Sequence, residues 1–382
     1  MTKTVLVGVD FGQLEFDLSM EELSQLAESS GAIPVSVVTC KRKSPDARTY
    51  LGSGKAIEIR ELVEFHEAEL VIFNHALAPA QQRNLEDVFG VRVLDRTGLI
   101  LDIFALRAQS HEGKLQVELV QLQHLATRLI KGALYVERQQ GGIGLRGPGE
   151  KQLELDRRLI GEKVKMLKAK LAKLSRQRQT QRKQRNRSGT FSVSIVGYTN
   201  AGKSTLFNAL THGNVYAANQ LFATLDTTTR KVYLGEGCSI ALSDTVGFIR
   251  ELPHGLVEAF KATLEHTAEA DLLLHVVDAS SPARHTQMEE VARILKEIGA
   301  DQVPQCVIWN KSDLCQREPE VSLNLCGTMQ SISVSARFGL GLDLLRGALH
   351  EVASQHYQKP PEDAPVSEPW ESEQASSSAD NH

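Results

Sequence analysis

The sequence predicts an α/β protein with an N-terminal α/β domain, a helical hairpin, and a second α/β domain whose sheet is mostly parallel. Residues 1–110 and 190–357 both alternate β-rich runs with helical runs, a pattern typical of parallel sheets covered by helices. Between these stretches, apolar residues recur at helical spacing on both sides of a glycine-rich segment. A length of 382 residues fits this division, because one core rarely organises so long a chain.

The first 110 residues contain short β-rich runs separated by amphipathic stretches. We expect strands at 4–9, 33–39, 70–74 and 92–95, and helices at 19–29, 55–66 and 78–89. Strands that alternate with helices in this way favour parallel pairing.

Residues 111–187 are expected to form the helical hairpin, with the glycine-rich segment 139–150 as its loop. The second arm is basic: residues 163–187 contain eleven Lys or Arg and no Asp or Glu. Such a face can be merely solvated, but a stretch of one charge repels itself unless it meets an anion. We therefore expect this arm to contact nucleic-acid phosphates, and Arg146 in the loop to do the same.

A phosphate-binding loop is predicted by the pattern G-x-x-x-x-G-K-[ST], which follows the apolar run 191–196 and precedes a helical run at 205–210. Glycine lets successive N–H groups face a phosphate, and the helix start adds a favourable partial charge. In such loops the lysine reaches the β- and γ-phosphates and the hydroxyl binds Mg²⁺. The candidate residues are Gly197, Tyr198, Thr199, Asn200, Ala201, Gly202, Lys203 and Ser204.

Three further motifs follow in the order found in guanine-nucleotide switches. They are D-x-x-G (Asp244, Thr245, Val246, Gly247), N-K-x-D (Asn310, Lys311, Ser312, Asp313) and S-A-R (Ser335, Ala336, Arg337). The Asp313 carboxylate can accept hydrogen bonds from the ring N–H and the exocyclic amine of guanine, a donor pair that adenine lacks. The order of the motifs predicts a Ras-like P-loop domain that binds GTP and GDP and hydrolyses GTP. We expect Lys203, Asp244 and Gly247 to be its catalytic residues.

Residues 222–230 lie between the first two motifs and contain several threonines. A switch loop needs a threonine that binds Mg²⁺ only while the γ-phosphate is present. Thr224, Thr227, Thr228 and Thr229 all qualify chemically, and their spacing alone does not choose between them.

Cysteine usage and hydropathy bound the cellular setting. The five cysteines are scattered without paired spacing, as is typical of reduced thiols in the cytoplasm. No apolar window approaches the ~18 residues of a membrane span, so we expect no such span. We also expect the protein to be cytoplasmic and monomeric. The acidic segment 358–382 is poor in apolar residues and is expected to be disordered.

Several long strings resemble the HflX family of translational GTPases over nearly the whole chain. They lie at residues 48–55, 141–150, 152–158, 222–230 and 244–254. The resemblance implies that Thr224 and Ser204 bind Mg²⁺ and that the switch segment Phe222, Ala223, Thr224, Leu225, Asp226 belongs to the nucleotide site. It also implies binding to the large ribosomal subunit and its rRNA, and splitting of stalled ribosomes.

The chain departs from the family pattern at two positions. Thr227 replaces a proline of the switch, and Lys151 replaces a threonine after the glycine-rich segment. Losing the proline frees one backbone dihedral.

Two residues bear on catalysis. Phe248 follows D-x-x-G, where many GTPases carry a glutamine that orients water, so we expect slow intrinsic hydrolysis stimulated by a partner. Asn200 resembles the asparagine of GTPases that bind K⁺ beside the phosphate, although it can equally be an ordinary loop residue. The rival hypothesis is a GTP-dependent scaffold for another RNA or protein, in which hydrolysis only resets affinity.

Overall fold

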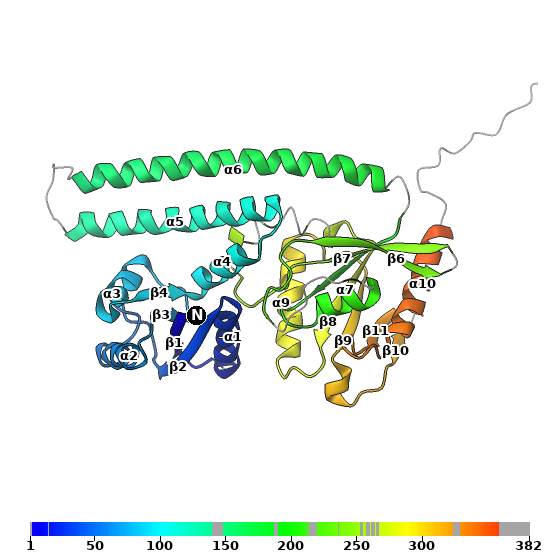
Figure 1. Cartoon of the computed structure of the whole chain (residues 1–382), viewed down its shortest axis with the longest axis horizontal. Coiled ribbons are helices and arrows are strands. Elements are labelled where there is room, and N and C mark those ends of the chain that lie inside the picture. Colours follow the sequence, from blue (N-terminus) through cyan, green and yellow to red (C-terminus); the bar gives the residue numbers. More distant parts are fainter. Residues whose placement is uncertain are drawn as a thin grey trace, which may run out of the picture.

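The computed structural model describes residues 2–358 with some gaps. The residues outside the description are 14, 140–147, 187–189, 212, 214–219, 236, 253–254, 257–259, 261–263, 265–266 and 324–328, as well as residue 1 and 359–382. The segment expected to be disordered lies outside the described residues except for Gln358, which is helical. Arg146 and most of the glycine-rich segment also lie outside the described residues. The predicted fold class is confirmed by an α/β N-terminal domain, two long helices and a second α/β domain (Figure 1).

The N-terminal sheet is four-stranded and parallel, in the order β2-β1-β3-β4. Its strands are β1 (Thr2–Asp10), β2 (Ala32–Lys41), β3 (Leu70–Phe73) and β4 (Arg92–Asp95). The covering helices are α1 (Phe16–Ser29), α2 (Ser53–His66), α3 (Pro79–Phe89) and α4 (Arg96–Arg107). Because side chains alternate along a strand, Leu6 packs with α1 and α4, whereas Val5 and Val7 pack with α2 and α3.

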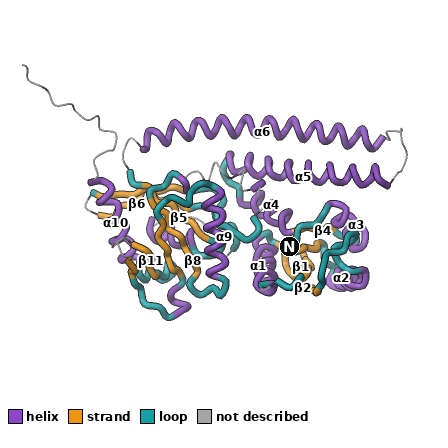
Figure 2. The backbone as a smooth tube through the Cα atoms, turned by 180° about the vertical axis from the view of Figure 1, so that it is seen from behind, coloured by secondary structure: helices purple, strands orange, loops and turns teal. Residues whose placement is uncertain are grey.

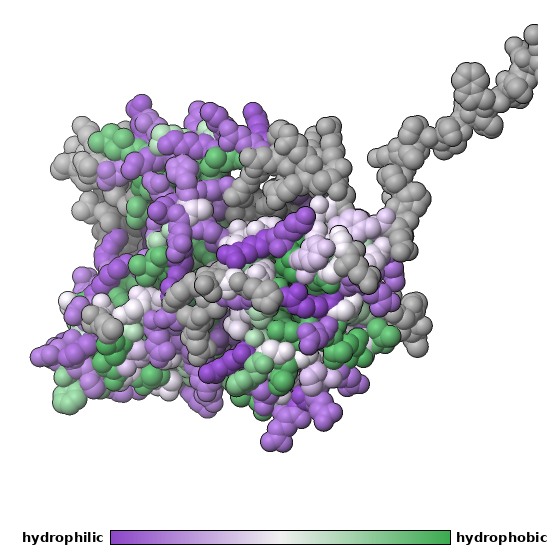
Figure 3. Space-filling view, turned by 45° about the vertical axis from the view of Figure 1, so that its right-hand side comes forward, coloured by the Kyte–Doolittle hydropathy of each residue, from purple (hydrophilic) through white to green (hydrophobic). Residues whose placement is uncertain are grey.

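Two long helices form the arms of the predicted hairpin, α5 (His111–Gln139) and α6 (Pro148–Asn186). They lie side by side above the N-terminal domain, and α6 continues over the second α/β domain in Figures 1 and 2. A small apolar cluster of Leu115, Leu119 and Leu167 joins the arms. Hydrophilic side chains, mixed with a few apolar ones, cover the upper part of the molecule in Figure 3.

The second sheet has seven strands in the order β10-β11-β9-β8-β5-β7-β6. These strands are β5 (Ser192–Gly197), β6 (Thr228–Gly235), β7 (Cys238–Asp244), β8 (Leu272–Asp278), β9 (Gln305–Asn310), β10 (Val321–Leu323) and β11 (Met329–Ser333). The pairs β6–β7 and β10–β11 are antiparallel and the rest parallel. The covering helices are α7 (Lys203–Thr211), α9 (Arg284–Glu297) and α10 (Leu342–Gln358).

Polar contacts join the two α/β domains directly. Glu22 on α1 accepts a hydrogen bond from the Tyr198 hydroxyl at 2.5 Å and pairs with Arg96 at 2.6 Å. The Tyr198 hydroxyl in turn accepts from the backbone N–H of Arg250 at 2.9 Å. The phosphate-loop region is thus tied to α1 of the N-terminal domain. Within the described residues, no helix is long and apolar enough to cross a membrane.

Candidate functional site

The predicted phosphate loop connects β5 to α7, and its backbone requires glycine at its first position. Gly197 has φ of 149°, and a Cβ there would lie 2.2 Å from the carbonyl oxygen of Val276. The buried Lys203 opens α7, and its Nζ donates to the carbonyl oxygen of Tyr198 at 2.7 Å. Burial lowers the pKa of Lys203 to about 8, although the Asp244 carboxylate opposes this shift.

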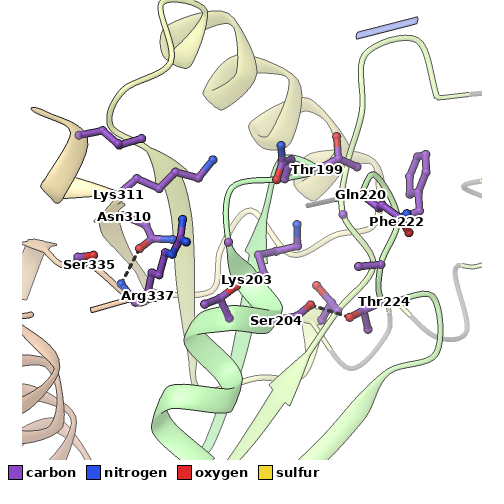
Figure 4. Close-up of a pocket in the computed structure, with 18 of the residues that line it drawn as sticks. Thr199, Lys203, Ser204, Gln220, Phe222, Thr224, Asn310, Lys311, Ser335 and Arg337 are labelled. Carbon is purple, nitrogen blue, oxygen red and sulfur yellow. Dashed lines mark hydrogen bonds between the residues drawn. The ribbon is translucent and has the colours of Figure 1, made fainter. Parts of the chain in front are cut away.

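Three oxygen-bearing side chains from separate elements converge beside the loop. Ser204 Oγ lies 2.6 Å from Thr224 Oγ1, and both hydroxyls donate to Asp244 Oδ2, at 2.8 and 2.9 Å. Figure 4 shows Ser204 and Thr224 pointing toward one another. Burial raises the pKa of Asp244, although hydrogen bonds from these hydroxyls and the charge of Lys203 oppose the rise.

This cluster fits Mg²⁺ by its own chemistry. The second carboxylate oxygen, Asp244 Oδ1, is buried and accepts no well-formed hydrogen bond from any residue that the structure describes. A carboxylate and two hydroxyls are the hard oxygen donors that Mg²⁺ prefers. Thr229, by contrast, lies in β6 with its hydroxyl 2.8 Å from Ser243 Oγ, and Thr228 is also in that strand. The geometry therefore favours Thr224 among the candidate threonines.

The opposite end of the site is organised by Asn310, at the end of β9. Its Nδ2 donates to the carbonyl oxygen of Ala201 at 2.8 Å, and its Oδ1 accepts from the backbone N–H of Ala336 at 3.0 Å. One side chain thus joins the phosphate loop to the S-A-R loop. Asp313 Oδ1 accepts from Ser335 Oγ at 2.6 Å, so the carboxylate is oriented before any base is bound.

Phe248 is part of the core and does not line the site. Its side chain is 1% exposed and packs in the large apolar cluster. Its backbone pairs with the phosphate loop: Thr199 N–H donates to the Phe248 carbonyl at 2.7 Å, and Phe248 N–H donates to the Gly197 carbonyl at 3.1 Å. No group at this position can orient water in the described structure.

These elements enclose a cavity of about 620 Å³. The predicted residues that line it are Thr199, Asn200, Gly202, Lys203, Ser204, Phe222, Ala223, Thr224, Thr245, Gly247, Asn310, Lys311, Asp313, Ser335, Ala336 and Arg337. Eight predicted residues do not line it: Gly197, Tyr198, Ala201, Leu225, Asp226, Asp244, Val246 and Ser312. Of these eight, Tyr198, Ala201 and Asp244 form hydrogen bonds with residues that line the cavity.

Sequence reasoning missed three lining residues, Thr205, Gln220 and Leu314. Thr205 and Leu314 each directly follow a predicted motif, so extending the motif by one residue would have found them. Gln220 precedes the switch segment and carries no local signal. Its hydrogen bond with Arg107 of α4 depends on the folded arrangement of the two domains.

Three family models match successive parts of the chain. They are described as GTP-binding GTPase N-terminal (residues 17–105), GTP-binding GTPase Middle Region (107–185) and 50S ribosome-binding GTPase (192–311). The GTPase HflX of Escherichia coli (strain K12) is 47% identical over 367 residues, covering 94% of this chain and 86% of that relative. The GTPase HflX of Caldanaerobacter subterraneus subsp. tengcongensis is 46% identical over 347 residues, covering 91% and 79%.

Two solved structures of GTP-binding proteins align with this chain over nearly its whole length. A GTP-binding protein from Sulfolobus solfataricus in complex with GDP aligns with a TM-score of 0.51 at 26% identity, covering 93% of this chain and 99% of that chain. The structure of SsGBP and GDP aligns with a TM-score of 0.52 at 25% identity, with the same coverage. With relatives this similar along almost all of its length, the chain belongs to the HflX family of GTPases, and it binds and hydrolyses GTP.

Proposed function

We propose that this GTPase is a switch that binds the large ribosomal subunit in its GTP state and separates stalled ribosomes. The observation that carries the proposal is the basic arm of the hairpin: from residue 163 to 187, α6 and the residue that follows it bear eleven cationic side chains and no anionic one. Phosphate contacts of this kind position a protein on structured RNA by shape and charge. The model that matches the C-terminal domain is described as a 50S ribosome-binding GTPase, which supports the same partner.

The arrangement of the cavity suggests roles for the main predicted residues. The backbone N–H groups of the phosphate loop and Lys203 hold the β- and γ-phosphates, whose charge keeps the lysine protonated despite its burial. The hydroxyls of Ser204 and Thr224 would hold Mg²⁺, with the Asp244 carboxylate beside them. When bound, the ion neutralises charge on the phosphates. The Asp313 carboxylate selects guanine.

Hydrolysis requires attack of water oxygen on the γ-phosphorus and cleavage of the bond to the β–γ bridging oxygen, which yields GDP and inorganic phosphate. Lys203 and the Gly247 N–H stabilise the charge on the transferring group. The missing function is the orientation of water, because Phe248 is buried in the core. We infer that the ribosome supplies or orders the group that performs it.

The test is GTP turnover by the purified chain, alone and with large ribosomal subunits. We expect slow turnover alone and at least a tenfold rise with large subunits, together with co-sedimentation only in the triphosphate state. Fast turnover without ribosomes would overturn the inference that the ribosome completes the site, and no co-sedimentation with large subunits in the triphosphate state would favour the scaffold hypothesis. Running the assay in K⁺ and in Na⁺ tests a K⁺ site at Asn200, which lines the cavity; equal rates would exclude it.

A further inference from the structure

The switch segment is attached to the N-terminal domain along its length. The backbone N–H of Leu221 donates to Ser29 Oγ at the end of α1, at 2.9 Å. The ring of Phe222 meets Phe104 of α4 edge-on, with the centroids 4.6 Å apart. Both rings are almost fully buried. The loop that flanks the nucleotide cavity is thus held by residues more than a hundred positions earlier in the chain.

Asp226 of the switch segment makes three of these hydrogen bonds, and its partners lie directly before α5. Its Oδ2 accepts from the backbone N–H groups of Gln109 and Ser110, at 2.9 and 2.7 Å. Its Oδ1 accepts from Ser110 Oγ at 2.5 Å, and Ser110 Oγ accepts from Gly113 N–H at 2.9 Å. A carboxylate of the switch segment therefore satisfies the free N–H groups before a hairpin helix, where its charge also suits the helix dipole.

We call the contact of the Asp226 carboxylate with Gln109 and Ser110, next to Gly113, the seat of Asp226. The seat leaves no space for a side chain at position 113. A Cβ on Gly113 would lie 2.3 Å from Asp226 Oδ1 and 3.0 Å from Ser110 Oγ. Nonbonded carbon and oxygen atoms do not approach to 2.3 Å, so a side chain at position 113 requires the Asp226 carboxylate to shift. Glycine costs about 1 kcal/mol relative to alanine inside a helix, and here it permits the contact.

The seat lies two residues from Thr224, whose hydroxyl is 2.6 Å from Ser204 Oγ and 2.9 Å from Asp244 Oδ2. We propose that Ser110 and Gly113 at the start of α5 are positioning residues for the GTP state. By seating Asp226, they hold Thr224 in the place where it completes the site. This inference rests on the proposed role of Thr224 as the Mg²⁺-binding switch threonine.

The coupling must run in both directions. If the seat strengthens binding of the triphosphate, then the bound triphosphate strengthens the seat by the same factor. GDP lacks the γ-phosphate that engages the switch threonine, so its affinity is independent of the seat. Loss of the γ-phosphate would therefore loosen the root of α5, the arm that pairs with the basic helix α6.

The first test compares Gly113→Ala with Gly161→Ala in the purified full chain. Both variants place a methyl group in a hairpin helix, but a Cβ at Gly161 meets nothing within 4 Å. Gly113→Ala should weaken binding of a non-hydrolysable GTP analogue about tenfold, within the usual range of coupling, and leave GDP affinity within twofold. Gly161→Ala should match the wild type for both nucleotides. Wild-type affinity of Gly113→Ala for the analogue would overturn the proposal.

The second test measures amide hydrogen exchange of residues 109–113. In the wild type, exchange should be at least fivefold slower with the GTP analogue than with GDP. Ser110→Ala, which removes the hydroxyl between Asp226 and Gly113, should abolish the difference, and Ser110→Thr should restore it. Equal exchange with both nucleotides in the wild type would overturn the coupling, because a purely structural cap is insensitive to nucleotide.

Thr224→Ala separates this inference from the functional proposal. If Thr224→Ala weakens analogue binding and Gly113→Ala does not, the seat at Asp226 fails and the assigned site stands. If Thr224→Ala has no effect, the assignment of the switch threonine itself is wrong. Neither result depends on ribosomes, so ribosome binding is tested independently.

Discussion

At the scale of single residues, the Asp313 carboxylate lines the cavity with one oxygen held by Ser335. Asp313→Asn replaces one acceptor oxygen with an NH₂ group, which would face the exocyclic amine of guanine donor to donor. We expect GTP affinity to fall roughly 100-fold, and affinity for xanthosine triphosphate to rise because its base has a carbonyl at that position. Competition binding measures both changes.

A matched control is Asp301→Asn, which makes the same change at an exposed site. It should leave both affinities at their wild-type values. Unchanged GTP affinity in Asp313→Asn would show that this carboxylate does not read the base.

Contiguous motifs predicted the position of those site residues whose contacts are made within the motif itself. Lys203 and Ser204 belong to a phosphate-loop motif that lies between a strand and a helix, so their place beside the cavity was predictable. The seat of Asp226 on Ser110 was not, because it joins residues 116 positions apart. The same holds for Tyr198, whose hydroxyl reaches Glu22 from across the domain boundary. Burial and the Glu22 carboxylate raise the pKa of that tyrosine, so it remains a neutral donor.

At the scale of elements, an ion pair anchors α5 to the end of the N-terminal strand β4. Arg128 lies 2.7 Å from Asp95, whose side chain is only 3% exposed and also caps α4 by accepting from Gly98 N–H at 2.8 Å. Arg128→Met leaves this buried carboxylate without its counter-charge, so we expect a loss of about 1–3 kcal/mol in the free energy of unfolding. Urea unfolding followed by circular dichroism measures it.

Arg158→Met provides the comparison, since it breaks a pair with Glu162 of which both members are exposed. An exposed pair contributes about 0–1 kcal/mol, so this variant should unfold nearly as the wild type does. Equal losses in the two variants would mean that the Arg128 pair does not anchor the helix.

Element positions followed from periodicity wherever one surface dominates burial. The predicted strand at 92–95 matches β4, and the predicted helices of the N-terminal domain lie within a few residues of α1, α2 and α3. The apolar spacing of 99–134 continues across the break between α4 and α5, so periodicity alone does not place that break. Strand β6 was not predicted, because its first residues belong to the threonine-rich segment 222–230, which was assigned to a switch loop.

At the scale of the whole molecule, one apolar cluster extends through both α/β domains. It includes Leu23 of α1 and Phe104 of α4 from the first domain, and Phe222, Phe248 and Leu273 from the second. A core shared between domains cannot be predicted from the sequence, because packing against the domain's own sheet already explains the hydrophobic periodicity of each domain. We therefore expect the two domains to unfold as one cooperative unit rather than as two units joined by a linker.

The shared core predicts that GDP stabilises the N-terminal domain, which lines none of the cavity. A ligand that binds only the native state stabilises everything that unfolds with its site, by about 2.7 kcal/mol at 100 times Kd. We therefore expect a single calorimetric transition that GDP shifts upward, and slower hydrogen exchange in β1 and α1 as well as around the site. Glu22→Ala removes the hydrogen bond to Tyr198 and the pair with Arg96, so protection of α1 by GDP should diminish while GDP affinity is kept. Protection confined to residues 190–357 in the wild type would instead mean that the contact between domains opens independently of unfolding, and that the switch segment alone carries the nucleotide signal.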